Sequence, residues 1–298
     1  MTILNTILNI IQWKRLLYLV FVLYLFKYCF LYGFGFNTVL SFYDLAILAT
    51  SITSLIASSH LILHYNNIKK SKDSLLKYTK IFAFFFGVIG LTLGTLISYK
   101  IDKPHYSLFF FSCMILLFIY SKKIKQKTFM SNILKPFLKS FVVLFVCWYD
   151  FPLNITSSKL DLYFNLQVIV ILYVIISFLT SIIKEIIIDI KNINQDNFYK
   201  NKTLPVLLGR RRSKNIAMTI TVLACFLVVF IAFFYVTNVY IRCVIISFGI
   251  IPELFFIYFL NKALNSDDYS NLLRILNVGY VLAFISIPII SYHLKHVI

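Results

Sequence analysis

Long apolar runs alternate along this chain with short polar stretches, in which most of the lysines lie. A run of about 20 apolar residues is the length at which an α-helix crosses a bilayer. We therefore predict an all-α, polytopic membrane protein in which residues 1–298 form one membrane-embedded domain. A short interfacial helix over residues 1–14 precedes nine transmembrane helices. The predicted spans cover residues 15–34, 43–65, 80–99, 106–121, 137–153, 162–190, 214–236, 240–261 and 272–292.

The composition supports a membrane protein rather than a soluble one. Hydrophobic residues make up 60% of the 298 positions, and only 13% are charged. Soluble domains carry a smaller apolar share, because their surface has to face water. The five cysteines lie inside apolar runs and form no Cys-x-x-Cys pair. We therefore predict buried thiols rather than a disulfide framework or a zinc site.

The third predicted span carries three glycines on one face, Gly87, Gly90 and Gly94. Small residues at this spacing let two membrane helices approach closely. We interpret them as a packing face rather than as part of a site.

The net charge of +18 is unevenly divided between alternate loops. One set carries Lys69, Lys70, Lys72, Lys77, Lys80, Lys122, Lys123, Lys125, Lys127, Lys200, Lys202, Arg210, Arg211, Arg212 and Lys214. The other set and the C-terminal tail carry only Lys100, Lys103, Lys159, Arg242 and Lys295. The positive-inside rule then places the N-terminus in the cytoplasm and the C-terminus on the opposite side. Orientation and anionic lipid headgroups account for the charge, so we predict no nucleic-acid partner.

A polar stripe interrupts the end of the sixth apolar run. Glu185, Asp189, Asn192 and Asp196 are spaced by four, three and four residues, which places their side chains on one helical face. Carboxylates at this spacing are hard oxygen ligands suited to Mg²⁺ beside a phosphate. Acids this deep in an apolar segment face a wet cavity or a partner. The alternative is an interfacial helix end whose acids pair with neighbouring basic residues, and the spacing alone leaves both interpretations open.

The stretch that contains this stripe, KEIIIDIKNINQDNFYKNKTLPVLLG at 184–209, resembles the second Asp-rich signature of the UbiA-type membrane prenyltransferases. The resemblance is closest to the branch that makes geranylgeranylglyceryl and digeranylgeranylglyceryl phosphates. There the signature commonly reads REIxKDIEDxxGDxxxGxxTLPxxxG. Two further stretches, IIQWKRLL near the N-terminus and YSKKIKQKTFMSNIL at 120–134, look like counterparts of other family segments.

The resemblance implies a nine-helix bundle with a cytoplasmic-side cavity, in which two Asp-rich motifs hold an isoprenyl diphosphate through Mg²⁺. Lys184 and Glu185 stand for the family's Arg-Glu pair, and Asp189 and Asp196 stand for its first and last aspartates. The implied reaction moves an isoprenyl group from an allylic diphosphate to a lipid or aromatic acceptor. The metal neutralises charge on the leaving diphosphate, and aromatic side chains shelter the allylic cation.

The first Asp-rich motif has lost its carboxylates. The matching stretch, SSHLILHYNNIKKSKDS at 58–74, has Leu63 where the family has an asparagine. His64, Asn67 and Ser71 occupy the three aspartate positions. Magnesium binds neutral ligands weakly and requires near-octahedral oxygen geometry. We therefore predict an altered metal site without a second Mg²⁺ ion.

The resemblance and the departures together give a set of candidate site residues. One Mg²⁺ ion is expected on Glu185, Asp189 and Asp196, and the catalytic candidates are Asp189, Asp196 and His64. The substrate-binding candidates are Asn67, Lys69, Lys70, Lys122, Lys125, Asn192 and Lys202. Two alternatives stay open, because a histidine at a membrane-edge helix end is more often an interfacial hydrogen-bonder than a base, and lysines such as those after His64 are more often a positive-inside anchor.

Three functions are compatible with these motifs. The first is an active prenyltransferase with an altered metal site, whose partners are an allylic isoprenyl diphosphate, a lipid acceptor and the surrounding membrane lipids. The second is a catalytically inactive relative that binds an isoprenoid or a lipid. The third is a membrane scaffold that docks partner proteins on its basic loops. One motif is kept and the other is lost, so the sequence does not decide whether the protein is an enzyme.

Overall fold

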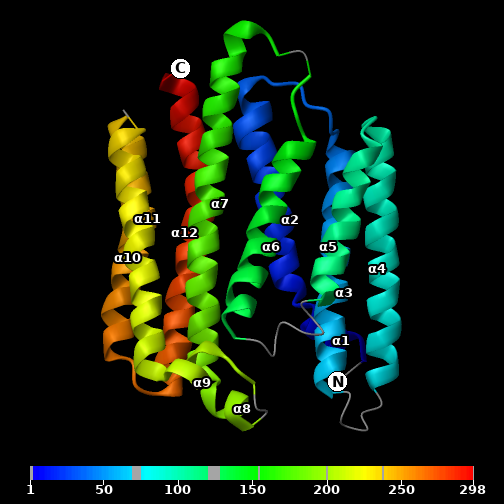
Figure 1. Cartoon of the computed structure of the whole chain (residues 1–298). Coiled ribbons are helices and arrows are strands. Elements are labelled where there is room, and N and C mark those ends of the chain that lie inside the picture. The colour runs from blue at the N-terminus through cyan, green and yellow to red at the C-terminus, as the bar shows by residue number, and fades with distance from the viewer. Residues whose placement is uncertain are drawn as a thin grey trace. The chain divides into compact units, whose positions relative to one another are not determined.

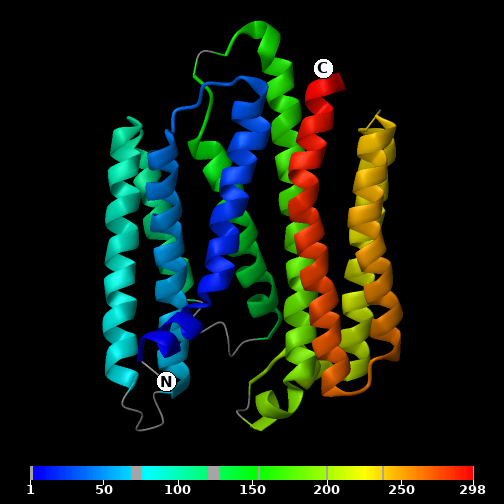
Figure 2. The same cartoon turned by 180° about the vertical axis from the view of Figure 1, so that it is seen from behind.

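The computed structural model describes residues 3–68, 75–119, 128–153, 155–198, 201–236 and 238–297. These residues are almost entirely helical (Figures 1 and 2), and each predicted span falls on a helix. Among them, seven helical stretches are long and apolar enough to cross a membrane. These are Trp13–Phe34, Phe42–Tyr65, Tyr78–Lys100, Lys159–Lys191, Arg210–Phe234, Val239–Lys262 and Ser266–Lys295. The other two predicted spans fall on a shorter apolar stretch, Pro104–Ile119, and on Thr128–Tyr149, so the count of nine spans stays a prediction.

The helices follow one another with short connections. In chain order, the elements of the N-terminal half are α1 (Ile3–Ile11), α2 (Trp13–Leu25), the π-helix η1 (Phe26–Leu31), the 3₁₀ turn η2 (Tyr32–Phe34), α3 (Phe42–Ile68), α4 (Leu75–Lys100), the 3₁₀ turn η3 (Pro104–Tyr106), α5 (Ser107–Ile119) and α6 (Thr128–Tyr149). The elements that follow are α7 (Ser157–Lys191), α8 (Ile193–Phe198), α9 (Leu204–Leu208), α10 (Arg210–Phe234), α11 (Val239–Lys262) and α12 (Ser266–Val297). Gln12 separates α1 from α2 with a positive φ of 60°. The first helix therefore ends at Ile11, three positions before the predicted end of the interfacial helix at residue 14.

The chain divides into two compact units. The first unit comprises Met1–Tyr24, Asn37–Lys125 and Phe145–Leu153. The second unit comprises Leu25–Phe36, Gln126–Leu144 and Asn154–Ile298. The single domain expected for the whole chain stays a prediction.

In the first unit, α4 packs closely against its neighbours along its glycine face. The hydroxyl of Ser51 on α3 donates a hydrogen bond of 2.6 Å to the carbonyl of Gly90. A Cβ atom added at Gly90 would lie 2.7 Å from the side chain of Leu55, and one at Gly94 would lie 2.5 Å from the ring of Phe110 on α5. Only glycine allows helices to approach this closely. The predicted packing face is therefore confirmed.

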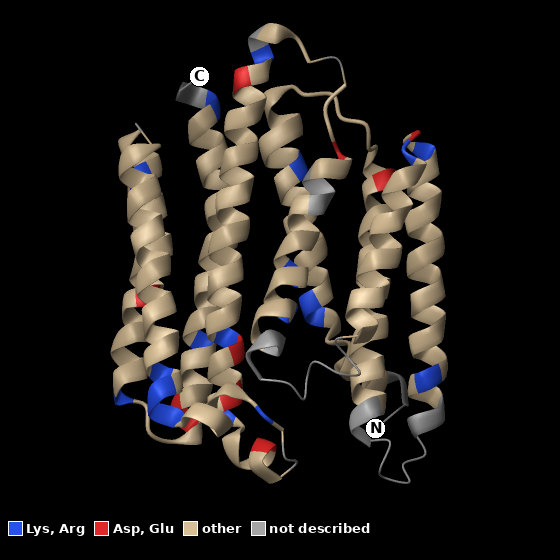
Figure 3. Ribbon diagram, viewed as in Figure 1, with Lys and Arg blue, Asp and Glu red and all other residues tan. Residues whose placement is uncertain are grey.

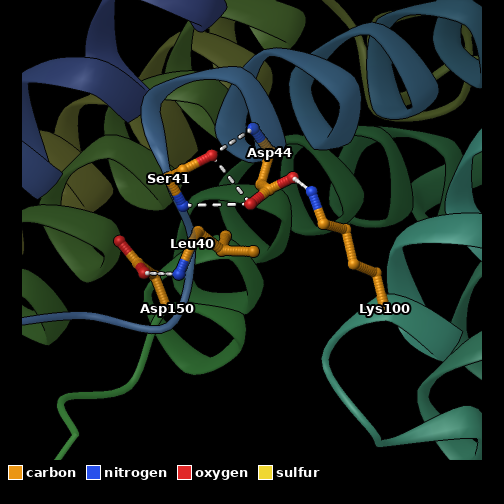
Figure 4. Close-up of polar contacts among 5 residues, drawn as sticks. All are labelled: Leu40, Ser41, Asp44, Lys100 and Asp150. Atoms are coloured by element: carbon orange, nitrogen blue, oxygen red, sulfur yellow. Dashed lines mark hydrogen bonds and ion pairs between the residues drawn. The ribbon is translucent and has the colours of Figure 1, made fainter.

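Polar side chains hold the beginning of α3 (Figure 4). The backbone N–H and hydroxyl of Ser41 donate to the Asp44 carboxylate at 3.2 and 2.8 Å, and the Asp44 N–H donates back to the Ser41 hydroxyl at 3.2 Å. This reciprocal pair satisfies donors that a helix N-terminus leaves free. Lys100 at the end of α4 lies 2.6 Å from the other Asp44 oxygen. Asp150 accepts a hydrogen bond of 3.0 Å from the N–H of Leu40.

The segment before α3 also pairs with the segment after α6 through their backbones. Thr38 and Pro152 form an isolated antiparallel bridge. The N–H of Val39 donates to the carbonyl of Phe151 at 3.1 Å, and the N–H of Leu153 donates to the carbonyl of Asn37 at 2.7 Å. These bonds fix the point at which α3 starts.

Replacing Asp44 by alanine should lower the free energy of unfolding by about 1–2 kcal/mol, because the substitution removes the side-chain acceptor at the beginning of α3. Thermal denaturation of the purified protein in detergent measures the change. Asp161→Ala removes an exposed carboxylate from α7 and serves as the matched control. Equal midpoints for the two variants would contradict the capping role.

In the second unit, a core of buried side chains connects α7, α9, α10, α11 and α12. It contains Ile182, Ile183, Ile186, Ile187, Ile190, Leu204, Ala217, Phe256, Leu260, Ala263, Tyr269, Leu272 and Leu276. The isoleucines recur at helical spacing on one face of α7, and β-branched residues pack well when they are fully buried. A different face of the same turns carries the acidic side chains Glu185 and Asp189.

Large apolar side chains also lie on the outside of both units. Phe84 on α4 is 74% exposed, and Phe226 on α10 is 64% exposed. Water does not tolerate this much contiguous apolar surface, whereas the hydrocarbon of a bilayer does. The exposed faces therefore agree with helices that lie in a membrane.

Candidate functional site

The predicted polar stripe lies on two helices rather than on one. Glu185 and Asp189 lie in the last two turns of α7, which ends at Lys191, whereas Asp196 lies on α8. Asn192 stands between the two helices with φ −96° and ψ 12°, outside the helical region. Asparagine leaves helices readily because its amide competes for backbone hydrogen bonds. The prediction of one continuous stripe is therefore wrong at its end.

The two acids on α7 are held by side chains of α6. The amide of Asn132 donates a hydrogen bond of 2.9 Å to Oδ2 of Asp189. The ammonium nitrogen of Lys135 lies 2.7 Å from Oε1 and 2.8 Å from Oε2 of Glu185. Asn132 is buried, whereas Lys135 and the two acids are half-buried. The acidic face of α7 is thus bound to a polar face of α6.

Two further lysines surround Tyr280 of α12 beside this contact. The ammonium group of Lys184 lies 5.3 Å from the centre of the Tyr280 ring, and that of Lys139 lies 5.5 Å from it. Lys184 also donates a hydrogen bond of 2.6 Å to the side chain of Asn277. The Tyr280 hydroxyl lies 2.7 Å from the hydroxyl of Ser181. We refer to Lys135, Lys139 and Lys184 as the lysine cluster.

The α6 side of this site was not predicted from the sequence. Asn132, Lys135 and Lys139 are spaced by three and four residues, which is the spacing that singled out the acids on α7. The predicted fifth span begins at residue 137, which left the first two of these residues outside it. Their spacing on one helical face between residues 128 and 149 is the signal that could have identified them.

Asp196 holds the residues that lead into α9. Its carboxylate accepts hydrogen bonds from the Asn201 amide at 3.0 Å and from the Thr203 hydroxyl at 3.4 Å. Thr203 precedes α9, whose first residue, Leu204, is buried in the core. Gly209 follows α9 with φ 84° and ψ 160°, a conformation that is essentially restricted to glycine. The Thr-Leu-Pro…Gly tail of the motif therefore shapes the corner between α8 and α10.

The remaining predicted site residues belong to other elements or lie outside the described residues. His64 lies half-buried near the end of α3, in the first unit, and the side chain of Asn67 lies outside the described residues. Lys202 is exposed between α8 and α9. Lys69, Lys70, Lys122 and Lys125 lie outside the described residues.

The sequence predicts one Mg²⁺ ion on Glu185, Asp189 and Asp196, and the side chains around these acids test whether such an ion fits. In the part of the chain that the structure describes, no three His, Cys, Asp or Glu side chains form a group that could hold a metal ion. Both oxygens of Glu185 contact an ammonium group, and one oxygen of Asp189 contacts an amide. An ammonium group at this position repels a divalent cation. The described residues therefore do not fit a magnesium cluster.

Charged residues of the second unit gather at the end where α8 and α9 lie (Figure 3). The acids of α7 and α8 lie there together with Arg210, Arg211, Arg212 and Lys214 at the beginning of α10. A site at this end can therefore attract an anionic ligand through the summed charge of several groups.

Residues 76–278 match the model of the UbiA prenyltransferase family. The matched stretch contains the acidic residues of α7 and α8 but not the altered first motif at 58–74. The digeranylgeranylglyceryl phosphate synthase of Methanosphaera stadtmanae is 23% identical over 177 residues, which covers 58% of this chain and 58% of that protein. The chain thus spans somewhat more than half the length of that relative.

Solved structures show the same fold. A structure of digeranylgeranylglyceryl phosphate synthase in membranes has a TM-score of 0.68 at 18% identity and covers 98% of this chain and 99% of its own. A UbiA homologue from Archaeoglobus fulgidus bound to GPP and Mg²⁺ has a TM-score of 0.58 at 14% identity and covers 94% of this chain and 99% of its own.

Proposed function

Because the chain belongs to the UbiA prenyltransferase family, we propose that it moves an isoprenyl group from an allylic diphosphate to a lipid or aromatic acceptor, at a site whose metal binding is altered. The acidic face of α7 carries this proposal. Glu185 and Asp189 lie on that face and contact side chains of α6 through an ion pair and a hydrogen bond. The isoleucines of the same turns pack in the core. The GPP bound by the A. fulgidus homologue supports a diphosphate donor, and the name of the M. stadtmanae relative supports a lipid acceptor.

The reaction breaks the bond between the allylic carbon and the diphosphate oxygen, and it forms a bond between that carbon and a nucleophilic atom of the acceptor. The diphosphate leaves with the electron pair, and the acceptor loses a proton. Fixed charges aimed at the developing charges accelerate such a step. In this proposal Asp189 is the catalytic carboxylate, and Asn132 fixes its orientation through the 2.9 Å hydrogen bond. Its negative charge stabilises the allylic cation as the diphosphate departs.

The other residue assignments stay predictions from the sequence. His64 and Asp196 are the further catalytic candidates. The sequence also predicts a single Mg²⁺ ion on Glu185, Asp189 and Asp196, although the side chains of these described residues do not form a group that fits a metal ion. The substrate-binding candidates are Asn67, Lys69, Lys70, Lys122, Lys125, Asn192 and Lys202. The protein is an integral, multi-pass membrane protein. A cytoplasmic N-terminus, a cytoplasmic-side cavity and a C-terminus on the opposite side also stay predictions.

A catalytically inactive relative that binds an isoprenoid or a lipid is the second candidate function. One observation favours it, namely that Lys135 and Asn132 already satisfy oxygens of both acids on α7. Such a protein would retain the prenyl-binding part of the bundle without ionising the donor.

Turnover by the purified full-length protein separates the two candidates. Labelled geranylgeranyl and farnesyl diphosphates are incubated with the protein in detergent and a panel of lipid and aromatic acceptors, once with Mg²⁺ and once with EDTA. Transfer of label to an acceptor is the expected result, and its dependence on Mg²⁺ tests the predicted metal ion. Folded protein that binds the diphosphate but neither transfers label nor releases diphosphate would favour the inactive relative.

A further inference from the structure

We propose that α7, α10, α11 and α12 of the second unit form a separate lipid site, in which Glu253 accepts a hydrogen bond from the hydroxyl group of an uncharged long-chain alcohol. These four helices pack against one another within the second unit (Figures 1 and 2). Neither the site nor its test involves the isoprenyl diphosphate. Two features carry the proposal, namely a buried carboxyl group that the proposed reaction does not use and loose packing of the helices beside it.

Glu253 is a buried acid in the middle of a membrane helix. The residue is only 8% exposed. Residues 239–252 of α11 precede it and residues 254–262 follow it. At a rise of 1.5 Å per residue, it lies roughly 14–21 Å from either end of the helix. An ionisable side chain at this depth is costly, and it marks a site unless its partners satisfy it.

One oxygen of this carboxyl group is not satisfied by the described residues. Thr180 of α7 is a hydrogen-bonding neighbour of the group, and Cys225 of α10 lies near enough to interact with it electrostatically. The Oε2 atom of Glu253 is buried and has no hydrogen-bond partner in the part of the chain that the structure describes. Buried polar atoms of this kind are rare. A group from outside the chain therefore has to meet this oxygen.

The outside group has to be a hydrogen-bond donor. The Thr180 hydroxyl donates its only proton to the Ile176 carbonyl at 2.9 Å, so it can only accept from Glu253. A proton on the carboxyl group is then placed on the oxygen that faces Thr180, and Oε2 is an acceptor with or without that proton. An ammonium group is excluded at this depth, because a charge in hydrocarbon is costly. An uncharged O–H group meets both conditions.

Three stretches of helix next to this acid are loosely packed. No described residue is buried from 242 to 252 on α11, from 171 to 179 on α7 or from 277 to 285 on α12. A helix that packs tightly in a bundle buries a stripe of side chains along its length, and each stretch is longer than two turns. A Cβ atom added at Gly279 would meet Pro252 of α11 at an ordinary contact distance of 3.5 Å. The side chains of these stretches are mostly apolar, which suits an alkyl or isoprenoid chain.

The stretches of α7 and α12 lie side by side. Hydroxyl contacts join the two helices near both ends of these stretches, Ser181–Tyr280 at 2.7 Å and Tyr173–Ser286 at 2.6 Å. A chain that follows one helix therefore also meets side chains of the other.

The loosely packed region ends at the carboxyl group. The stretches of α7 and α11, which run in the same direction (Figure 1), stop directly before Thr180 and Glu253. Phe256 and Leu260, one and two turns further along α11, belong to the buried core. The hydroxyl end of the ligand is therefore placed at Glu253, and its chain is placed along the loosely packed stretches.

Photolabelling of the full chain in detergent tests the proposal. The probe is hexadecanol that carries a diazirine and an alkyne, and the label should map to α7, α11 or α12 within the three stretches. Unlabelled hexadecanol should compete with the probe. Hexadecyl methyl ether has the same chain but no O–H donor, so it should compete about tenfold less well. This comparison needs no variant of the protein.

Variants of the acid separate a binding role from a structural one. Glu253→Met should reduce labelling by about tenfold and remove the preference for the alcohol over the ether. Glu253→Gln keeps a carbonyl acceptor and should retain labelling within about threefold. Ser247→Ala is the matched control in the same stretch of α11, because the Ser247 hydroxyl already donates to the Val244 carbonyl at 3.3 Å. Its labelling should equal that of the wild type.

Thermal unfolding without added alcohol completes the test. Glu253→Met should unfold at or above the wild-type midpoint, because an apolar side chain replaces an unsatisfied buried oxygen. A lower midpoint together with reduced labelling would show that the acid is structural, which overturns the proposal. Equal competition by the alcohol and the ether would also overturn it, since Oε2 would then be met by water. Label spread evenly over the outer helix faces would have the same meaning.

Discussion

Replacing Asp189 by asparagine should lower the rate of prenyl transfer by about a hundredfold or more, which is the usual effect of removing one oriented group that stabilises a developing charge. The side chain keeps its size and can still contact Asn132, so α7 should remain packed on its isoleucine face. What is lost is the negative charge beside the allylic cation. The measurement is the initial rate with labelled geranylgeranyl diphosphate at saturating acceptor.

Two comparisons make this result specific to the site. Asp267→Asn removes a carboxylate from the first turn of α12 in the same unit and should leave the rate unchanged. Binding of the diphosphate by Asp189→Asn should change by less than the rate, because the charge acts mainly when the bond ionises. A variant with full activity would remove Asp189 from the mechanism.

Replacing Gly94 by alanine should destabilise the first unit by about 1–3 kcal/mol, the usual cost of adding a methyl group to a closely packed core. The new Cβ would lie 2.5–2.7 Å from three atoms of the Phe110 ring. That ring is fully buried and packs against Tyr149, with ring centres 5.9 Å apart. The Tyr149 hydroxyl in turn lies 2.6 Å from the Ser98 hydroxyl, so the ring has little room to move. Thermal or denaturant unfolding in detergent measures the loss.

Gly87→Ala is the matched control on the same helical face. Its nearest contacts would be the Met114 methyl group at 3.1 Å and the Ser58 hydroxyl at 3.2 Å. A methionine end moves easily, and alanine is favoured over glycine in helices by about 1 kcal/mol. We therefore expect a change smaller than about 1 kcal/mol. A Gly87→Ala variant that loses as much stability as Gly94→Ala would contradict the assignment of the clash to Phe110.

Apolar run length predicts most of the helices, because a bilayer-spanning segment has to satisfy its backbone hydrogen bonds within itself. The sixth predicted span, 162–190, corresponds to α7, which extends a few residues further at its N-terminal end. The close approach of α3 and α4 was also predictable, since glycine spacing is a local property. The pairing of Asn37 with Leu153 was not, because nothing in either segment specifies a partner so far along the chain.

The candidate site was half predictable for a similar reason. The spacing of Glu185 and Asp189 is a property of one helix and can be read from the local sequence. Their contacts with Asn132 and Lys135 depend instead on how α6 packs against α7. The prediction placed Asp196 on the same helix as Glu185 and Asp189, but the backbone leaves the helical conformation at Asn192, directly after the end of α7. Local periodicity therefore identifies the residues on each helix but not which partner satisfies them.

The hydrogen bond from Leu40 to Asp150 also constrains how the protein is made. Its two residues are 110 positions apart, and a ribosome adds about 5–20 residues per second. Roughly 5–20 seconds of translation therefore separate the synthesis of the two ends of this contact. During that interval the beginning of α3 is held by the local Ser41–Asp44 pair and, once Lys100 has been made, by its ion pair with Asp44. A ribosome that pauses between these two positions prolongs this stage of biogenesis, in which the N-terminal half of the first unit awaits its last segment.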